Sequence, residues 1–99
     1  MEIAKIILEQ IKSIDYWALG AYGAKNFYSL PESKEYAGGL SFFVNGMNHQ
    51  GTVFIYLKWT DEYKLVFTST DGSVKKEVDG VYCDMLVEIL DFIEKDDSE

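Results

Sequence analysis

Two residues of this chain have side chains suited to nucleophilic catalysis, Cys83 and His49. A cysteine nucleophile needs an imidazole base within hydrogen-bond reach, and a helix N-terminus lowers the pKa of a thiol. Cys83 falls in the first turn of an expected helix, whereas His49 lies in the polar stretch 48–51. No third orienting group or glycine-flanked nucleophile turn accompanies them. We therefore expect no catalytic residues: Cys83 flanks a buried helix face, and His49 is a loop residue.

The sequence also offers no recognisable metal or cofactor site. One histidine and one cysteine cannot complete a Cys/His zinc site. The pairs Asp61-Glu62 and Asp96-Asp97 lack the alternating pattern of a calcium loop. Gly38-Gly39 has no following Lys-Ser/Thr, so it does not form a phosphate-binding loop. We expect no metal, no cofactor and no enzymatic activity.

The negative charge of the chain is concentrated near its C-terminus. Residues 77–99 hold nine acidic residues and one lysine, while residues 1–76 are balanced, so these last 23 residues account for the net charge of −8. Four acids recur at spacings of four, three and three, which places them on one side of a helix: Asp84, Glu88, Asp91 and Glu94. Asp96 and Asp97 extend this acidic surface. It predicts a binding site for a protein with a basic surface. The alternative is the solvated side of an amphipathic helix.

A second candidate surface combines aromatic residues with lysines. Alternation in the expected strands 52–59 and 62–69 puts one set of side chains on a single sheet face: Phe54, Tyr56, Lys58 and Lys64. Such a face can stack bases and hold phosphates. The absence of arginine and the net charge of −8 oppose a polyanionic partner. If a helix covers this face, the aromatic side chains are core. Direct nucleic-acid binding is therefore the less favoured alternative.

Composition indicates one small globular domain. The 99 residues are 47% hydrophobic and 15% aromatic, which is enough for a core. A single cysteine excludes an internal disulfide and is typical of a reducing compartment. We find neither an apolar run of membrane-spanning length nor a secretory signal. We expect a cytoplasmic protein with no membrane contact, in which residues 1–95 form one domain and residues 96–99 an acidic, frayed tail.

Hydrophobic periodicity predicts a helix, then strands, then a second helix. Isoleucines at positions 3, 7, 11 and 14 indicate an amphipathic helix over 2–12. Strands are expected over 40–44, 52–59, 62–69 and 74–78, and Asn45-Gly46 and Asp71-Gly72 are turn signals. A helix over 81–94, with Asp79 as its N-cap, completes the pattern. The prediction is an α+β fold: an antiparallel meander of about four to five strands, with both helices on one sheet face.

The segment 15–30 is harder to interpret. Alternation of Trp17, Leu19 and Ala21 suggests a strand, although Gly20 and Gly23 equally mark a bend. Residues 31–39 read as a loop. Aromatic residues crowd this part of the chain: Tyr16, Trp17, Tyr22, Phe27 and Tyr28. They either fill the core or form an exposed patch for a partner or a second copy, so a homodimer is a further possibility. An uncovered sheet face with Phe54 and Tyr56 would also favour dimerisation.

Four short motifs occur in a fixed order along the chain: Leu8-Glu9-Gln10, Gly23-Ala24-Lys25-Asn26-Phe27, Leu40-Ser41-Phe42, and Gly80-Val81-Tyr82 with Asp84-Met85-Leu86. This series resembles a group of short uncharacterised proteins of bacteriophages and related mobile elements, over about residues 7–90. The resemblance implies a phage-type origin and carries no activity.

We therefore expect a non-enzymatic phage-type accessory protein that acts in the host cytoplasm. Its partner would be a host or phage protein with a basic surface, bound through the acidic C-terminal helix. By analogy, it would inhibit a nucleic-acid-binding defence factor, as anti-CRISPR-like proteins do. The alternative is a single-stranded nucleic-acid-binding protein that uses the aromatic and lysine sheet face.

Overall fold

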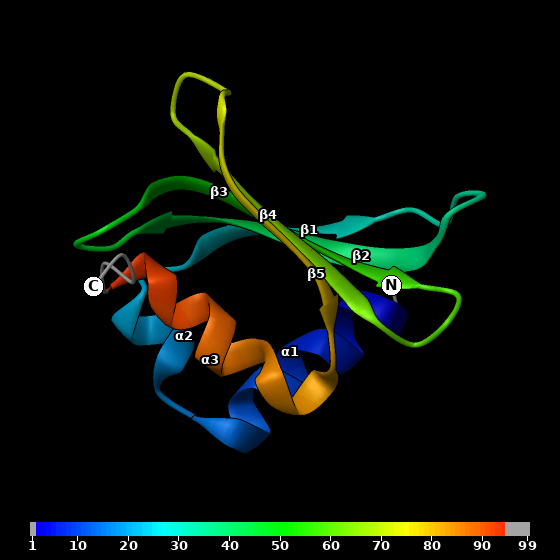
Figure 1. Cartoon of the computed structure of the whole chain (residues 1–99). Coiled ribbons are helices and arrows are strands. Elements are labelled where there is room, and N and C mark those ends of the chain that lie inside the picture. The colour runs from blue at the N-terminus through cyan, green and yellow to red at the C-terminus, as the bar shows by residue number, and fades with distance from the viewer. Residues whose placement is uncertain (1, 95–99) are drawn as a thin grey trace.

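The computed structural model describes residues 2–94 and centres on a five-stranded antiparallel sheet, in which strands adjacent along the chain pair with each other (Figure 1). The strands are β1 (Lys25–Leu30), β2 (Tyr36–Asn45), β3 (Gln50–Lys58), β4 (Tyr63–Ser69) and β5 (Val74–Val81). Helix α1 (Glu2–Ile14) precedes them, and the short helix α2 (Ala18–Ala21) leads into β1. The predicted α+β meander is confirmed. The predicted tail, residues 96–99, lies outside the described residues.

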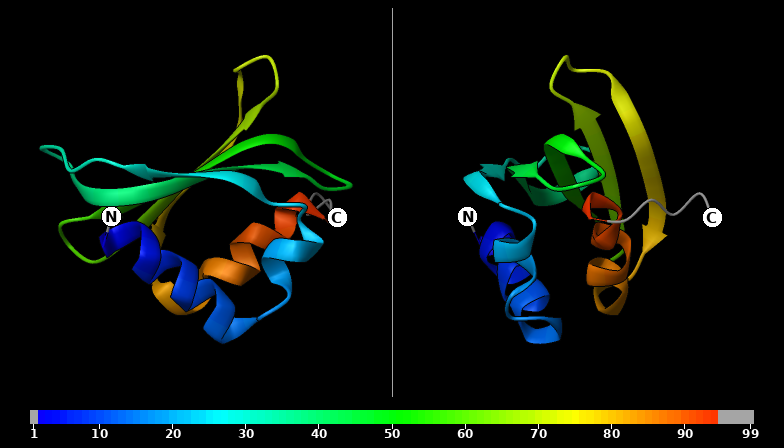
Figure 2. Two further views of the ribbon diagram at one scale, coloured as in Figure 1. Left: turned by 180° about the vertical axis from the view of Figure 1, so that it is seen from behind. Right: turned by 90° about the vertical axis from the view of Figure 1, so that its left-hand side faces the viewer.

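The helices lie on one face of the sheet. Figure 2 shows α1 beside α3 (Leu86–Leu90) beneath the strands, and the two helices are in contact. The core between these layers combines alternating strand residues with the apolar side of each helix. Its fully buried members include Ile7, Ile11, Leu40, Phe42, Val44, Val53, Ile55, Leu65, Phe67, Leu86 and Leu90. The predicted placement of both helices on one sheet face is therefore confirmed.

Helix α1 follows the predicted isoleucine stripe over most of its length. Ile7 and Ile11 are fully buried, one turn apart, and Ala4 extends the same stripe toward the N-terminus. Ile14 is 46% exposed at the last residue of the helix, so the buried stripe ends at Ile11. The Tyr63 hydroxyl donates a hydrogen bond of 2.6 Å to the Gln10 side-chain carbonyl, which ties α1 to β4.

Strand β2 begins earlier than predicted, because Gly38-Gly39 lies inside the strand and does not end a loop. Gly39 pairs with Tyr56 on β3, and a Cβ at this position would overlap the carbonyl oxygen of Ile55. The glycines therefore permit a close approach of two backbones.

The strand suggested over residues 17–21 is wrong. Residues Ala18–Ala21 form one helical turn, in which Ala18 and Leu19 are buried. Tyr22 follows one turn after Ala18 and is also buried, so a helical spacing covers these residues. Of the crowded aromatic residues, Tyr22 alone enters the core. Tyr16, Trp17, Phe27 and Tyr28 are exposed.

The predicted helix over 81–94 is wrong in its start and in its continuity. Strand β5 continues to Val81, which pairs with Tyr63 and is fully buried, so Asp79 lies in a strand and caps no helix. A 3₁₀ turn, η1 (Cys83–Met85), then leads into α3, and a second 3₁₀ turn, η2 (Asp91–Ile93), ends the segment. Cross-strand pairing with β4 thus overrides the local helical pattern.

The β2–β3 turn holds this C-terminal segment against the sheet. The backbone N–H groups of Asn48 and His49 donate to the Ile93 carbonyl at 2.9 and 3.1 Å. The Asn48 side-chain amide donates to the Phe92 carbonyl at 2.8 Å. The connection between β2 and β3 therefore holds η2 in place through these hydrogen bonds.

His49 lies in the connection between β2 and β3, as expected, but its side chain is fully buried. Its ring packs edge-on against Phe67 and lies 5.8 Å from the Phe92 ring, and neither ring nitrogen has a hydrogen-bond partner among the described residues. Burial lowers the pKa of the imidazole, and the positive charge of Lys75 acts in the same direction. The backbone groups of Thr52 and Thr68 oppose this shift only in part.

The buried imidazole predicts a loss of stability in mild acid. The unfolded chain takes up a proton near the ordinary histidine pKa of 6.5, while the folded chain resists it. The stability contributed by His49 is therefore complete above pH 6.5 and is lost as the pH falls toward the lower folded-state pKa. The midpoint temperature of thermal unfolding should therefore be lower at about pH 5.5 than at about pH 7.5. Ordinary carboxylates stay ionised throughout this range.

The variant His49→Phe should flatten this dependence, because His49 is the only histidine of the chain. Circular dichroism melts of both proteins at the two pH values provide the measurement. An equal fall in the unfolding midpoint of both proteins would assign the acid sensitivity to other groups.

Candidate functional site

The face of the sheet that points away from the helices is uncovered in the part of the chain that the structure describes (Figures 1 and 2). We call it the open face. Its residues follow from the cross-strand register, in which paired residues share a face, and they include Tyr28, Tyr36, Ser41, Phe43, Thr52, Phe54, Tyr56, Lys58, Lys64, Val66 and Glu77. All four candidate residues of the aromatic and lysine surface are only partly buried: Phe54, Tyr56, Lys58 and Lys64.

Stacked aromatic rings form the centre of the open face. Tyr36 and Tyr56 stack with ring centroids 4.6 Å apart and an interplanar angle of 29°. Tyr56 and Phe54 follow each other on β3 at 6.2 Å and 10°. Phe43 lies on the neighbouring strand, with the Lys25 ammonium 5.5 Å from its ring centre. Sequence alternation predicted Phe54 and Tyr56, but Tyr36 was missed because it was assigned to a loop.

A polar depression adjoins this row at the β3–β4 end of the sheet. Its volume is about 460 Å³, and it is lined by Glu35, Tyr36, Lys58, Trp59, Thr60, Lys64 and Asp79. The Trp59 indole N–H donates to the Ser33 carbonyl at 3.2 Å, yet 57% of the side chain is exposed. The depression thus combines two lysines with aromatic rings that solvent can reach.

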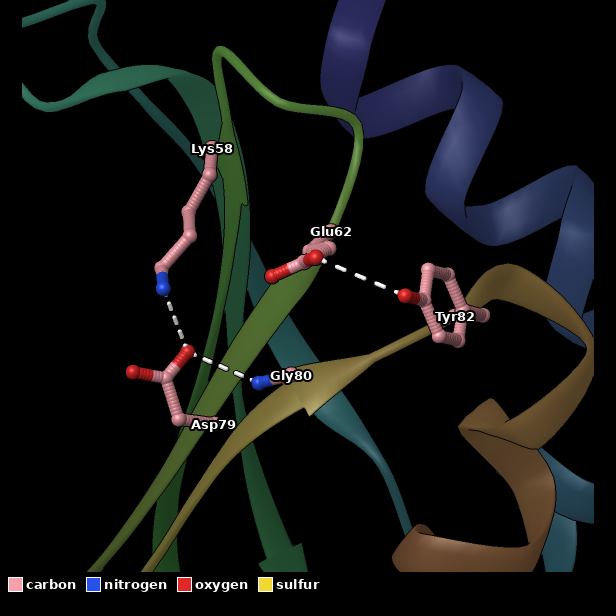
Figure 3. Close-up of polar contacts among 5 residues, drawn as sticks. All are labelled: Lys58, Glu62, Asp79, Gly80 and Tyr82. Carbon is pink, nitrogen blue, oxygen red and sulfur yellow. Dashed lines mark hydrogen bonds and ion pairs between the residues drawn. The ribbon is translucent and has the colours of Figure 1, made fainter.

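An ion pair occupies part of this depression. The Lys58 ammonium lies 2.6 Å from an Asp79 carboxylate oxygen, and this oxygen also accepts a hydrogen bond of 2.8 Å from the Gly80 N–H. Figure 3 shows both contacts. These contacts lower the pKa of Asp79, and the Asp79 hydrogen bond raises the pKa of Lys58. Nearby, the Tyr82 hydroxyl donates to Glu62 at 3.5 Å. Asp79 therefore already balances the charge of Lys58.

The structure does not arrange the predicted acidic residues as one helical row. Asp84 belongs to η1, Glu88 to α3 and Asp91 to η2, and a 3₁₀ turn advances about 120° per residue rather than the 100° of an α-helix. Asp84 and Glu88 are exposed, while Asp91 and Glu94 are partly buried. Asp96 and Asp97 lie outside the described residues.

Asp91 also has an internal partner. The Tyr22 hydroxyl donates a hydrogen bond of 3.2 Å to its carboxylate. Burial, followed by the negative charge of Asp91, raises the pKa of Tyr22 far above its ordinary value. Asp91 therefore helps to hold η2 against Tyr22, the residue that follows α2, and only part of the predicted acidic surface is available to a partner.

Cys83 and His49 do not form a reactive pair. The Cys83 side chain is exposed and borders a shallow depression beside Gln10 and Ile14 of α1. The imidazole of His49 is enclosed at the β2–β3 turn and cannot reach a substrate. Among residues 2–94, we find no group of three or more histidine, cysteine or acidic side chains that could hold a metal ion. No helix within this range is long and apolar enough to cross a membrane.

Functional inference for this protein rests on the geometry of the site. No protein-family model, curated protein or solved structure matches this chain.

Proposed function

We propose that this protein is a non-enzymatic binding module whose open face binds single-stranded nucleic acid. One observation carries the proposal: a row of stacked aromatic rings lies uncovered on the sheet, next to Lys58 and Lys64. The sequence favoured the acidic surface because the chain has no arginine, carries a net charge of −8 and could not show whether a helix covers these rings. The helices pack on the other face, so the rings are available to a partner.

Base stacking is the interaction for which this row is suited. Every base has a flat π-face, and stacking on an aromatic side chain contributes about 1–3 kcal/mol per base without sequence preference. Tyr56, with Phe54 and Tyr36 on either side, offers adjacent rings in nearly parallel planes. An unpaired strand can splay its bases onto such a platform, whereas a duplex keeps its bases stacked on each other.

The distribution of charge supports this assignment despite the net charge of −8. The exposed carboxylates of Asp84 and Glu88 belong to the helical segment on the far side of the sheet (Figure 1). Lys58 and Lys64 lie on the open face. The sheet thus separates Asp84 and Glu88 from these lysines, and Glu77 and Asp79 are the carboxylates of the C-terminal segment that remain on the open face beside them.

Asp79 would compete with phosphate for Lys58. An exposed ion pair is worth little net stability, so a phosphate oxygen can replace the carboxylate at small cost. Lysines bind phosphate as point charges, without the two-pronged grip of arginine. If Lys58 and Lys64 each neutralise one phosphate, the logarithm of affinity should fall against the logarithm of salt concentration with a slope of about −1.4.

Removal of the central ring should weaken binding. Tyr56→Ile keeps a branched apolar side chain that suits a strand but cannot stack a base, so affinity should fall by about fivefold or more. Fluorescence polarisation with a labelled oligothymidylate of about 12 nucleotides measures it. Tyr16→Ile is the matched control, because Tyr16 is 67% exposed and lies outside the open face. Equal affinities for the two variants, or no binding by the native protein, would count against the proposal.

Neutralisation of the competing carboxylate should strengthen binding. Asp79→Asn frees Lys58 and should raise the affinity and steepen the salt dependence. Glu88→Gln makes the same change in net charge on the helical side, so it is the matched control. The same polarisation assay over a series of salt concentrations compares them. If both variants gain equally, the effect is one of overall charge and not of this site.

The acidic-surface hypothesis keeps two exposed carboxylates in its favour, Asp84 and Glu88. It predicts capture of a basic protein that survives nuclease treatment and is lost in the double variant Asp84→Asn/Glu88→Gln. The same double variant should bind the oligonucleotide as the native protein does. The two functions therefore separate experimentally.

A further inference from the structure

The two edges of the sheet differ in their protection against pairing. Strand order places β1 at one edge and β5 at the other. Strand β5 carries charged residues along most of its length: Lys75, Lys76, Glu77 and Asp79. Strand β1 has a single charge, at its first residue, and its exposed side chains include Phe27 and Tyr28. Charged edges resist pairing with another chain, whereas an uncharged apolar edge permits it.

An apolar groove runs beside the β1 edge, between this strand and α1. Its volume is about 290 Å³, and it is lined by Ala4, Lys5, Leu8, Phe27, Tyr28, Ser29 and Leu40. Phe27 reaches it because an irregularity between Lys25 and Tyr28 interrupts the β1–β2 register, with Asn26 at a φ of 58°. The Phe27 ring stacks on Phe42 at 5.4 Å and remains 42% exposed. An exposed aromatic side chain thus stands at the rim of an apolar groove.

Charge favours this edge over the rest of the surface as a contact between two copies. The chain is neutral over residues 1–76, which include α1 and β1, and the excess of acid begins at Glu77 on β5. Contact through β1 leaves both β5 edges at the far ends of the assembly. Contact through β5 would instead require the charged side chains of both edges, Lys75, Lys76, Glu77 and Asp79, to give up solvent, and charged edges resist such pairing.

We infer that β1 pairs with β1 of a second copy around a two-fold axis, which joins two five-stranded sheets into one of ten strands. The interface is isologous: the Phe27 ring at each β1 edge lies against the groove of the other copy. The irregularity near Asn26 and the following Pro31 confine the pairing to about residues 27–30. So short a contact is expected to bury less than about 1,200 Å². The dimer should therefore dissociate reversibly, with a dissociation constant on the order of 1–100 µM.

The pairing would extend the proposed function. Antiparallel pairing at an edge keeps both open faces on the same side of the joined sheet, so one nucleic-acid strand could contact both, with a gain from effective concentration. This consequence rests on the proposed function. The pairing itself does not, because it needs no nucleic acid.

Sedimentation equilibrium of the full chain, without nucleic acid and with a reductant to keep Cys83 free, tests the inference. The native protein should move from 11.3 kDa toward twice that mass as its concentration rises from about 1 to 500 µM. Tyr28→Lys places a charge on the edge and should weaken the association by tenfold or more. Tyr16→Lys is the matched control, because Tyr16 and Tyr28 are both 67% exposed, and it should associate as the native protein does.

A protein that stays at 11.3 kDa throughout would overturn the inference. So would a dimer that Tyr28→Lys leaves intact, since the contact would then lie elsewhere. Tyr56→Ile should still dimerise. A failure of dimerisation and a failure of nucleic-acid binding are thus seen in different assays, because sedimentation is measured without nucleic acid.

Discussion

The packing of both helices against one face of the sheet is the constraint on which the rest of this structure depends. Strand β3 sits at the middle of the sheet and alternates strictly: Val53 and Ile55 are fully buried beneath the helices, and Phe54 and Tyr56 point the other way. Burial of the first set supplies the main driving force for folding, at roughly 25 cal/mol per Å² of apolar surface. The second set is then left on a face that no described element covers, where Tyr56 stacks with Tyr36 and lies nearly parallel to Phe54.

Two part-buried tyrosine hydrogen bonds help to hold the helical layer in its position. Tyr63 links β4 to α1 through Gln10, and Tyr22 links the start of the sheet to η2 through Asp91. Each hydroxyl belongs to a core tyrosine, so loss of its partner would leave a polar group without compensation. The same contact removes Asp91 from the acidic surface that the sequence predicted. Part of the C-terminal charge therefore has a structural role, which leaves fewer carboxylates on the helical side to bind a partner.

Much of the architecture could be predicted from local patterns, because those patterns report period and turn chemistry directly. Alternation over residues 52–69 identified β3 and β4 and assigned Phe54, Tyr56, Lys58 and Lys64 to one face. The Asp71-Gly72 turn was also correct, with Gly72 at a φ of 91°. Errors arose where long-range contacts decide. Val81 is a strand residue because it pairs with Tyr63. Gly39 also lies in a strand, where the backbone carbonyl of Ile55 comes too close for any side chain. The partnership of Lys58 with Asp79 depends on that same extension of β5, so no sequence pattern predicted it.

Which side of the sheet stays open was beyond the sequence, since both faces of β3 carry large apolar side chains. The structure resolves this ambiguity, and it also shows how the net charge is distributed over the two sides of the sheet. A net charge of −8 predicts repulsion of a polyanion only when the charge is spread evenly over the surface. Here Asp84 and Glu88 lie on the helical side, and Lys58 and Lys64 on the other, within reach of the aromatic row. Because the Debye length is about 8 Å at physiological ionic strength, charges across the sheet are screened from a ligand on the open face. The local charge at that face, which Asp79 controls by holding Lys58, therefore governs what the face can bind.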